Sequence, residues 1–400
     1  MRYSTRKFLT ASVAGAAMLA AASASAQDVK IGVILGFTGP IESLTPGMAD
    51  SAELALKEIN DSGMFLNGEK LASVRADSTC IDAAAATAAA ERLVTSENVV
   101  GIMGADCSGV TIAIANNVAV PNGVVMISPS ATSPALSTAE DDGLFFRTAP
   151  SDARQGQVVA DILRDRGVNS IAITYTNNDY GAGLAASIEA AFEAAGGTVT
   201  LVASHEDGKA DYSAEVGALA AAGGEVLVVA GYLDQGGRGI IRSALDLGAF
   251  DTFELPDGMV GDTLTEVFGD EINGTFGQHP GTDSPGASQF GELAAAAGFD
   301  GTSAFAPESY DAAALIMLAM AAAGSTDPQV YKEHVMDVAN APGEMIYPGQ
   351  LGHALEIIAA GGDVDYVGAS AVELIGSGES AGNYREVEVV DGAFQTVRYR

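Results

Sequence analysis

The chain has 400 residues, of which 52 are Asp or Glu and 19 are Lys or Arg, and its formal net charge is −33. A surface this acidic repels nucleic acid and anionic lipid, so neither is expected as a partner. This length exceeds what one hydrophobic core usually supports, and about two domains are expected.

The first residues have the pattern of an export signal. The basic residues Arg2, Arg6 and Lys7 precede the apolar run 8–22, and Ala24-Ser25-Ala26 has the small-x-small pattern of a cleavage site. We therefore expect residues 1–26 to be a signal peptide, cleaved near Ala26, and the mature protein to lie outside the cytoplasm. The alternative is an uncleaved membrane anchor, which the shortness of the run disfavours.

The chain contains only two cysteines, Cys80 and Cys107. Disulfides persist outside the cytoplasm, so we expect these two to pair, closing a loop worth roughly 3 kcal/mol in the chain-entropy treatment. Two buried free thiols or half of a metal site are the alternatives. The four histidines have no ligand spacing, so no metal site is expected.

Short runs rich in Val and Ile alternate with longer Ala-rich stretches, which indicates strands alternating with helices. The expected strands are Val29 to Leu35, Leu71 to Ala76, Val99 to Met103, Val124 to Ile127, Ser170 to Tyr175, Thr198 to Ala203 and Glu225 to Ala230. Between the first two, a helix is expected at 48–59, with its apolar residues on one face. This alternation predicts an α/β fold with parallel sheets flanked by helices.

The chain is long enough for two such series, one to about Pro150 and one from about Ser151 to about Asn273. Helices are expected at 305–323 and 327–338, and short strands after 363. The extra helices suggest that the chain returns to the first lobe, giving lobe 1 as 27–150 plus about 276–365 and lobe 2 as 151–275 plus about 366–400. Lobes joined by several crossings form a hinge with a ligand cleft between them.

Three turns follow expected strands and could face this cleft. Thr45 followed by Pro46 is typical of a helix start, with Thr45 as N-cap. Ser108 is expected at the next helix start, where free backbone N–H groups favour a carboxylate. The hydroxyl-rich segment 128–134 should face the same crevice. An ordinary helix cap is the alternative for both helix starts.

Motifs in this order resemble those of the leucine/isoleucine/valine-binding proteins of ABC importers, which are type I periplasmic binding proteins. The resemblance spans nearly the whole mature chain and rests on the cysteine pair, Cys107-Ser108, Ser128-Pro129-Ser130-Ala131-Thr132, Arg147-Thr148 with Asp152, Asn178-Asp179-Tyr180-Gly181, Gly231-Tyr232, Pro256-Asp257-Gly258, Glu308-Ser309-Tyr310-Asp311 and Asp365-Tyr366-Val367-Gly368-Ala369.

The resemblance implies a hinged pair of Rossmann-like lobes and a role for each of several residues. Ser108 and Thr132 would hold a ligand carboxylate, and Thr132 with the Ser130 carbonyl would take an ammonium. Tyr180 and Tyr232 would close over the ligand from the second lobe, and Asp257 would oppose the ammonium. Asp106 departs from the family, which has an apolar residue there; it is either solvated or favours a ligand with a side-chain donor.

The function implied is that of a monomeric periplasmic receptor that delivers a small amino acid to the permease of an ABC importer, without a cofactor. An aliphatic amide, a urea or an aromatic acid is the alternative ligand, and signalling to a membrane protein the alternative role. An enzyme is a weaker interpretation, because neither a nucleophile elbow nor a phosphate loop occurs. Residues 181–186 match a dinucleotide-binding pattern but start several residues after their strand.

Overall fold

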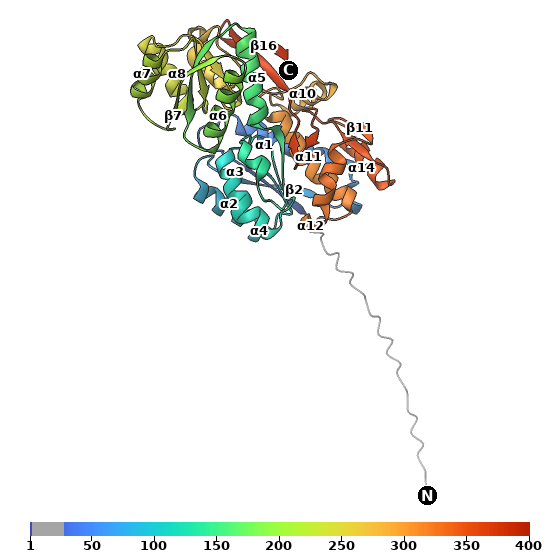
Figure 1. The fold of residues 1–400 in the computed structure, drawn as a ribbon. Coiled ribbons are helices and arrows are strands. Elements are labelled where there is room, and N and C mark those ends of the chain that lie inside the picture. Colours follow the sequence, from blue (N-terminus) through green and yellow to red (C-terminus); the bar gives the residue numbers. More distant parts are fainter. Residues whose placement is uncertain (2–27) are drawn as a thin grey trace.

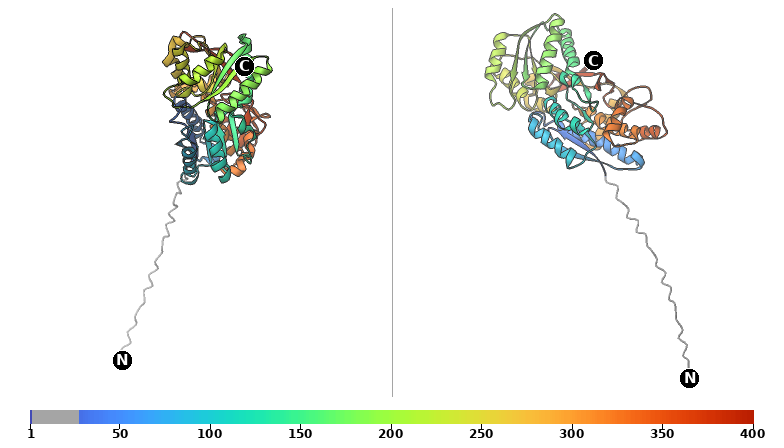
Figure 2. Two further views of the ribbon diagram at one scale, coloured as in Figure 1. Left: turned by 60° about the vertical axis from the view of Figure 1, so that its left-hand side comes forward. Right: turned by 60° about the horizontal axis from the view of Figure 1, so that its bottom comes forward.

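The computed structural model describes Met1 and residues 28–400. The expected signal peptide therefore lies almost wholly outside the described residues. Figure 1 shows two bodies, and the two further views in Figure 2 show the same division. Each body is built on a seven-stranded sheet, and we call them the first and second lobe by the sheet they contain.

The first lobe has the strand order β13-β14-β5-β4-β3-β1-β2, and all neighbouring strands from β14 to β2 are parallel. Its strands are β1 (Val29–Leu35), β2 (Leu71–Asp77), β3 (Gly101–Gly104), β4 (Met126–Ser128), β5 (Phe145–Pro150), β13 (Leu374–Ile375) and β14 (Glu379–Ser380). Its longer helices are α1 (Thr45–Ser62), α2 (Ala83–Thr95), α3 (Ser108–Ile114), α10 (Pro285–Ala297), α11 (Ala306–Ala323) and α14 (Leu351–Ala359).

The second lobe repeats this order with β16-β15-β10-β9-β8-β6-β7, in which β15 and β16 are antiparallel additions. Its strands are β6 (Ser170–Thr176), β7 (Thr198–His205), β8 (Val226–Ala230), β9 (Phe253–Leu255), β10 (Phe276–Pro280), β15 (Tyr384–Val390) and β16 (Ala393–Tyr399). Its helices are α5 (Asp152–Asp165), α6 (Asp179–Ala194), α7 (Ser213–Ala222), α8 (Gly236–Leu247) and α9 (Asp262–Phe268).

The remaining elements are short. A small separate sheet pairs β11 (Glu344–Ile346) with β12 (Val364–Tyr366). The segment expected as one helix at 327–338 is divided into α12 (Pro328–Tyr331), η6 (Lys332–His334) and α13 (Val335–Ala339). The other short helical elements are α4 (Val120–Asn122), η1 (Phe65–Asn67), η2 (Ala115–Ala119), η3 (Pro134–Thr138), η4 (Asp257–Met259) and η5 (Gly269–Ile272).

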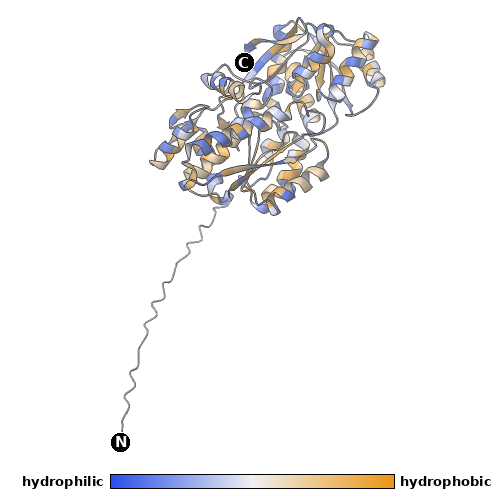
Figure 3. Ribbon diagram, turned by 180° about the vertical axis from the view of Figure 1, so that it is seen from behind, coloured by the Kyte–Doolittle hydropathy of each residue, from blue (hydrophilic) through white to orange (hydrophobic). Residues whose placement is uncertain are grey.

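The α/β fold expected from the sequence is confirmed, and each expected strand is present within a few residues of its expected bounds. Strand β8 is buried along its whole length and β1 along its last five residues, as their apolar runs require in a sheet covered on both faces. Figure 3 shows mainly apolar residues along these strands and mixed polarity on the surrounding helices. Among the described residues, no helix is long and apolar enough to cross a membrane.

The chain crosses between the lobes after β5, after β10 and after β14. Two of the lobe boundaries expected from the sequence therefore do not match the sheets to which these residues belong. Residues 276–280 form β10, which pairs with β9 in the second lobe, whereas 374–380 contain β13 and β14, which extend the first sheet beyond β5. Strand β10 covers the edge of β9 and β14 covers the edge of β5, edges that would otherwise be open. Local sequence does not specify which edge a strand will cover.

Helix α11 returns the chain to the first lobe and packs on α1 and on β3, β4 and β5. Fourteen of its residues are buried, including Glu308, whose two carboxylate oxygens make no hydrogen bond. Burial raises the pKa of Glu308 to about 8. The side chain is thus neutral in the folded protein at pH 7.

Glu308 should make the folded protein less stable as the pH rises. In the unfolded chain this carboxyl titrates near 4.5 and in the folded protein near 8, so the folded state binds more protons between these values and stability falls with pH across that window. Glu308→Gln should reduce the loss of unfolding free energy between pH 5 and pH 8 by about 3 kcal/mol, measured by urea denaturation. The exposed Glu292→Gln should leave the pH dependence unchanged, and an unchanged slope in Glu308→Gln would contradict the assignment.

The expected disulfide joins Cys80 and Cys107, 27 residues apart. It ties the loop after β2 to the residue that precedes α3. In the double variant Cys80→Ser/Cys107→Ser we expect unfolding free energy to fall by about 3 kcal/mol, because the unfolded chain regains the entropy of an open loop. Comparing the oxidised parent with the double variant by denaturation measures this; equal stability would show that the bond does not constrain the unfolded state.

Candidate functional site

Each sheet has one place where consecutive connections leave in opposite directions, and open α/β sheets bind ligands at the carboxyl ends of the strands there. In the first lobe this place lies between β1 and β3, and in the second between β6 and β8. The segments that follow these strands contain Ser108, at the start of α3, in one lobe, and Tyr180, in the first turn of α6, and Tyr232, after β8, in the other. They meet in one small interlobe cavity.

Six of the seven expected ligand-binding residues line this cavity. The first lobe contributes Asp106, Ser108 and Ser130, and the second contributes Tyr180, Tyr232 and Asp257. Thr132 does not line the cavity. Its side chain is fully buried behind it, and its Oγ1 makes no hydrogen bond.

Ser108 is the first residue of α3, and Cys107 occupies the N-cap position. Ser108 is therefore not an N-cap residue, which was the alternative to a ligand-binding role. Its Oγ accepts a hydrogen bond from Ser133 N at 3.1 Å, which joins the start of α3 to the hydroxyl-rich segment after β4. Thr45 also differs from expectation: it is the first residue of α1 rather than the N-cap, and its hydroxyl donates to the carbonyls of Gly36 and Glu42.

Asp106 is buried and joins the ends of three strands. Its carboxylate accepts from Gly36 N after β1 and from Ser78 Oγ after β2, both at 2.8 Å, and it follows β3 itself. Burial raises its pKa, and these donors act in the opposite direction. The sulfurs of Cys80 and Cys107 lie within 4.8 Å of a carboxylate oxygen of Asp106, but they are joined in the disulfide. The solvated state considered for Asp106 is therefore wrong.

Asp257 is the buried acid of the second lobe. Its Oδ1 accepts from the Tyr180 hydroxyl and from Gly258 N, and its Oδ2 accepts from Gln155 Nε2, each at 2.7 Å. Tyr180 also stacks on Tyr232, with ring centroids 5.1 Å apart. Burial raises the pKa of Asp257, whereas the three donors lower it. The carboxylate is thus held rigidly at the cavity wall.

Other lining residues were not identified as site residues from the sequence. Ile41 and Leu44 lie in the loop after β1, and Phe305 directly precedes α11, with a φ of 65°. They supply apolar surface beside the two carboxylates. The first two fall in a loop whose place in the cleft was expected, but no local signal marks Phe305, because the return of α11 to the first lobe brings it there.

The lobes are closed tightly around this cavity, which has room for about one water molecule at about 20 Å³. Tyr180, Tyr232, Asp106 and Asp257 are all nearly inaccessible. A guest molecule must therefore enter through an opened form, and these side chains must move apart to contain it.

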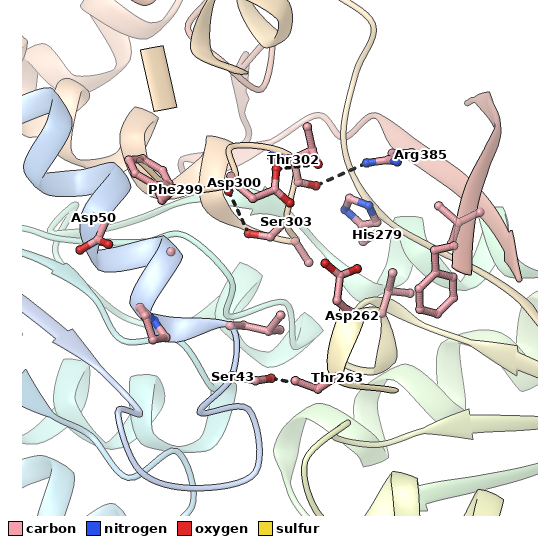
Figure 4. Close-up of a pocket in the computed structure, with 18 residues that line it drawn as sticks. Ser43, Asp50, Asp262, Thr263, His279, Phe299, Asp300, Thr302, Ser303 and Arg385 are labelled. Carbon is pink, nitrogen blue, oxygen red and sulfur yellow. Dashed lines mark hydrogen bonds between the residues drawn. The ribbon is translucent and has the colours of Figure 1, made fainter. Parts of the chain in front are cut away.

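A larger crevice of about 470 Å³ lies beside the cavity and shares Leu44 with it. Figure 4 shows Ser43 of the first lobe meeting Thr263 of the second, at the opposite side of the crevice from Arg385 and Thr302. Asp234 completes this contact: its backbone N–H donates to the Pro40 carbonyl, and its carboxylate accepts from Ser43 N at 2.9 Å. These hydrogen bonds join the two lobes at the mouth of the cleft, beside the small cavity.

The family model for the periplasmic binding protein matches residues 28–341. The Leu/Ile/Val-binding protein homolog 1 of Brucella abortus is 34% identical over 333 residues, which cover 81% of this chain and 86% of that protein. This chain belongs to the Leu/Ile/Val-binding family of periplasmic binding proteins.

Solved structures confirm the fold of this binding protein. A leucine-binding protein from Thermotoga maritima has a TM-score of 0.79 at 23% identity, covering 93% of this chain and 98% of that one. A solute-binding protein from R. palustris in complex with 4-hydroxybenzoate has a TM-score of 0.74 at 17% identity, covering 94% and 97%. The resemblance seen in the sequence motifs and the two-lobed type I fold are thus confirmed.

Asp234 should stabilise the closed form of the binding protein. Asp234→Ala removes the carboxylate that accepts from Ser43 N across the cleft mouth, which should weaken ligand binding about three- to tenfold, the effect of one exposed charge-assisted hydrogen bond. Calorimetry measures the affinity, and small-angle scattering measures closure. Asp246→Ala, an exposed acid on α8, is the control, and equal affinities in the two variants would show that the mouth contact does not contribute.

Proposed function

We propose that this binding protein captures a small amino acid between its lobes in the periplasm and delivers it to the permease of an ABC importer. The observation that carries the proposal is the charge of the cavity wall. It contains two carboxylates, Asp106 and Asp257, and no Lys, Arg or His among the described residues. An enclosed guest therefore needs a positive group, because a buried carboxylate without a counter-charge is costly.

The orientation of the guest in this proposal follows from the two cavity walls. The ammonium would lie against Asp257, which Tyr180, Gln155 and Gly258 hold in place. The carboxylate would lie towards Ser108 and the segment 130–132, where hydroxyl and backbone donors lie. Thr132 does not line the closed cavity, so it would not contact the guest there.

An aromatic acid is the second candidate ligand, since the R. palustris neighbour holds 4-hydroxybenzoate. The only charged group of such an acid is its negative carboxylate, which would meet two buried carboxylates in this cavity. The lining favours a zwitterion. An aliphatic amide or urea remains an outcome of the ligand screen described below.

We propose that the bound ligand leaves unchanged. The site binds without an attacking group activated for chemistry: each carboxylate is engaged by hydrogen-bond donors of the chain. Binding from both lobes favours the closed form by the difference in affinity between the two forms, and the closed form is what a permease would recognise. Signalling to a membrane protein would use the same closure.

A thermal-shift screen of amino acids, amides, ureas and aromatic acids tests the ligand class. With the best ligand, Asp257→Asn should lower affinity at least thirtyfold, about 2 kcal/mol, because the ammonium loses its buried counter-charge. Asp262→Asn changes an exposed acid in the neighbouring crevice and is the matched control. An Asp257→Asn protein that binds as well as the parent by calorimetry would refute the assignment, and ligand recovered chemically altered from denatured protein would refute simple carriage.

A further inference from the structure

A second buried acid lies behind the pocket carboxylate. Asp152 begins α5, immediately after the chain crosses into the second lobe, and is fully buried. Gln155 follows within the same helical turn, is also fully buried, and lies between Asp152 and Asp257. Two carboxylates that share one buried region cannot both ionise without a large cost.

The hydrogen-bond donors are divided unequally between the two acids. Asp257 accepts three bonds of 2.7 Å, from Tyr180, Gln155 and Gly258. Asp152 has weaker donors: its Oδ1 accepts from the same Gln155 Nε2 at 3.4 Å, and the Thr132 hydroxyl is the other side-chain donor near it. Short bonds from several donors stabilise an ionised carboxylate much more than one long bond does.

The orientation of the Gln155 amide is fixed by its other end. Its Oε1 accepts from Asp257 N and from Gln278 Nε2 on β10, each at 3.4 Å. Turning the amide over would place an oxygen against the Asp257 carboxylate and an NH₂ group against these two donors. The chain therefore presents the amide donor to Asp257 and keeps it there.

The surrounding charges do not reverse this difference. Burial, and then the charge of Asp257, raise the pKa of Asp152 well above its usual range, and the nearby Arg147 and the Thr132 hydroxyl lower it less. Arg147 is itself paired with Glu379 at 2.6 Å. The other titratable groups that face the pair are Glu254 on β9, Tyr180 on α6, Tyr232 after β8 and Tyr384 on β15.

We propose that Gln155 is a positioning residue that decides which of the two buried carboxyls carries the negative charge: Asp257 is ionised and faces the pocket, and Asp152 holds a proton behind it. The value of that charge to an amino-acid ligand rests on the function proposed above. The three donors to Asp257 all belong to the second lobe, so the arrangement persists when the lobes separate.

The charge distribution can be measured without any ligand. In protein with ¹³C-labelled aspartate carboxyls, NMR titration of the parent should show Asp257 ionised and Asp152 protonated at pH 7, with both signals assigned from Asp152→Asn and Asp257→Asn. Gln155→Met removes the donor and should raise the titration midpoint of Asp257 by about one pH unit. Asp152→Asn replaces a protonated carboxyl by a neutral amide of the same shape and should leave that midpoint nearly unchanged.

Glu308→Gln is the matched control, since it replaces a buried acid in the other lobe and should move neither signal. A parent protein in which Asp152 is the ionised partner would overturn the proposal, whether or not any Gln155 variant folds. An Asp257 midpoint unchanged in folded Gln155→Met would also overturn it. A merely structural role for Gln155 would lower the melting temperature without moving the midpoint.

Calorimetry with L-leucine between pH 5 and pH 8 separates this proposal from the proposed function. Asp152→Asn should bind within about threefold of the parent at pH 7, whereas Asp257→Asn should not. If Asp152→Asn binds as poorly as Asp257→Asn, the proposal fails. If the NMR midpoints behave as expected but no amino acid binds in the thermal-shift screen, the charge assignment of Gln155 stands and the proposed ligand class is wrong.

Discussion

The burial of a carboxylate between two lobes is the constraint on which the cleft depends. Asp257 lies at the wall of a cavity closed from both sides, held by donors from α6, from α5 and from its own turn. An ionised group in such a place needs a counter-charge when water is excluded. The closed cleft is therefore an environment that a cationic group of suitable size completes, whereas a neutral or anionic guest leaves the charge unbalanced.

The architecture places this charge opposite a complementary surface. Both sheets have the same parallel order, so each lobe has its ligand-binding loops at the same edge. The crossings of the chain turn those edges towards each other, with Ser108 on one side and Asp257 on the other. Contacts from both lobes exist together only in the closed form. A guest that binds the closed form more tightly therefore also raises the population of that form. The bonds of Asp234 at the mouth add to this balance from outside the cavity.

Much of the site could be anticipated because its residues follow strands. Ser108, Ser130, Tyr180 and Tyr232 each come soon after a buried strand, and the carboxyl ends of parallel strands meet at one edge of a sheet. Thr132 shows the limit of this reasoning: it lies in the same segment as Ser130, but it is fully buried and does not line the cavity. A difference of two residues in a loop is decided by packing rather than by sequence pattern.

The sequence by itself determined the α/β alternation, the cysteine pair, the order of the family motifs and the acidic character of the chain, because each depends on local pattern or composition. The tertiary structure alone decided that β10 belongs to the second sheet and β14 to the first, that Phe305 joins the cavity, and that Gln155 lies between Asp152 and Asp257. The physical reason is that several of these placements depend on distant partners: β14 pairs with β5 through Glu379 and Arg147, and Gln155 bonds to Asp257, 102 positions away. No local preference encodes which distant partner such a group will meet.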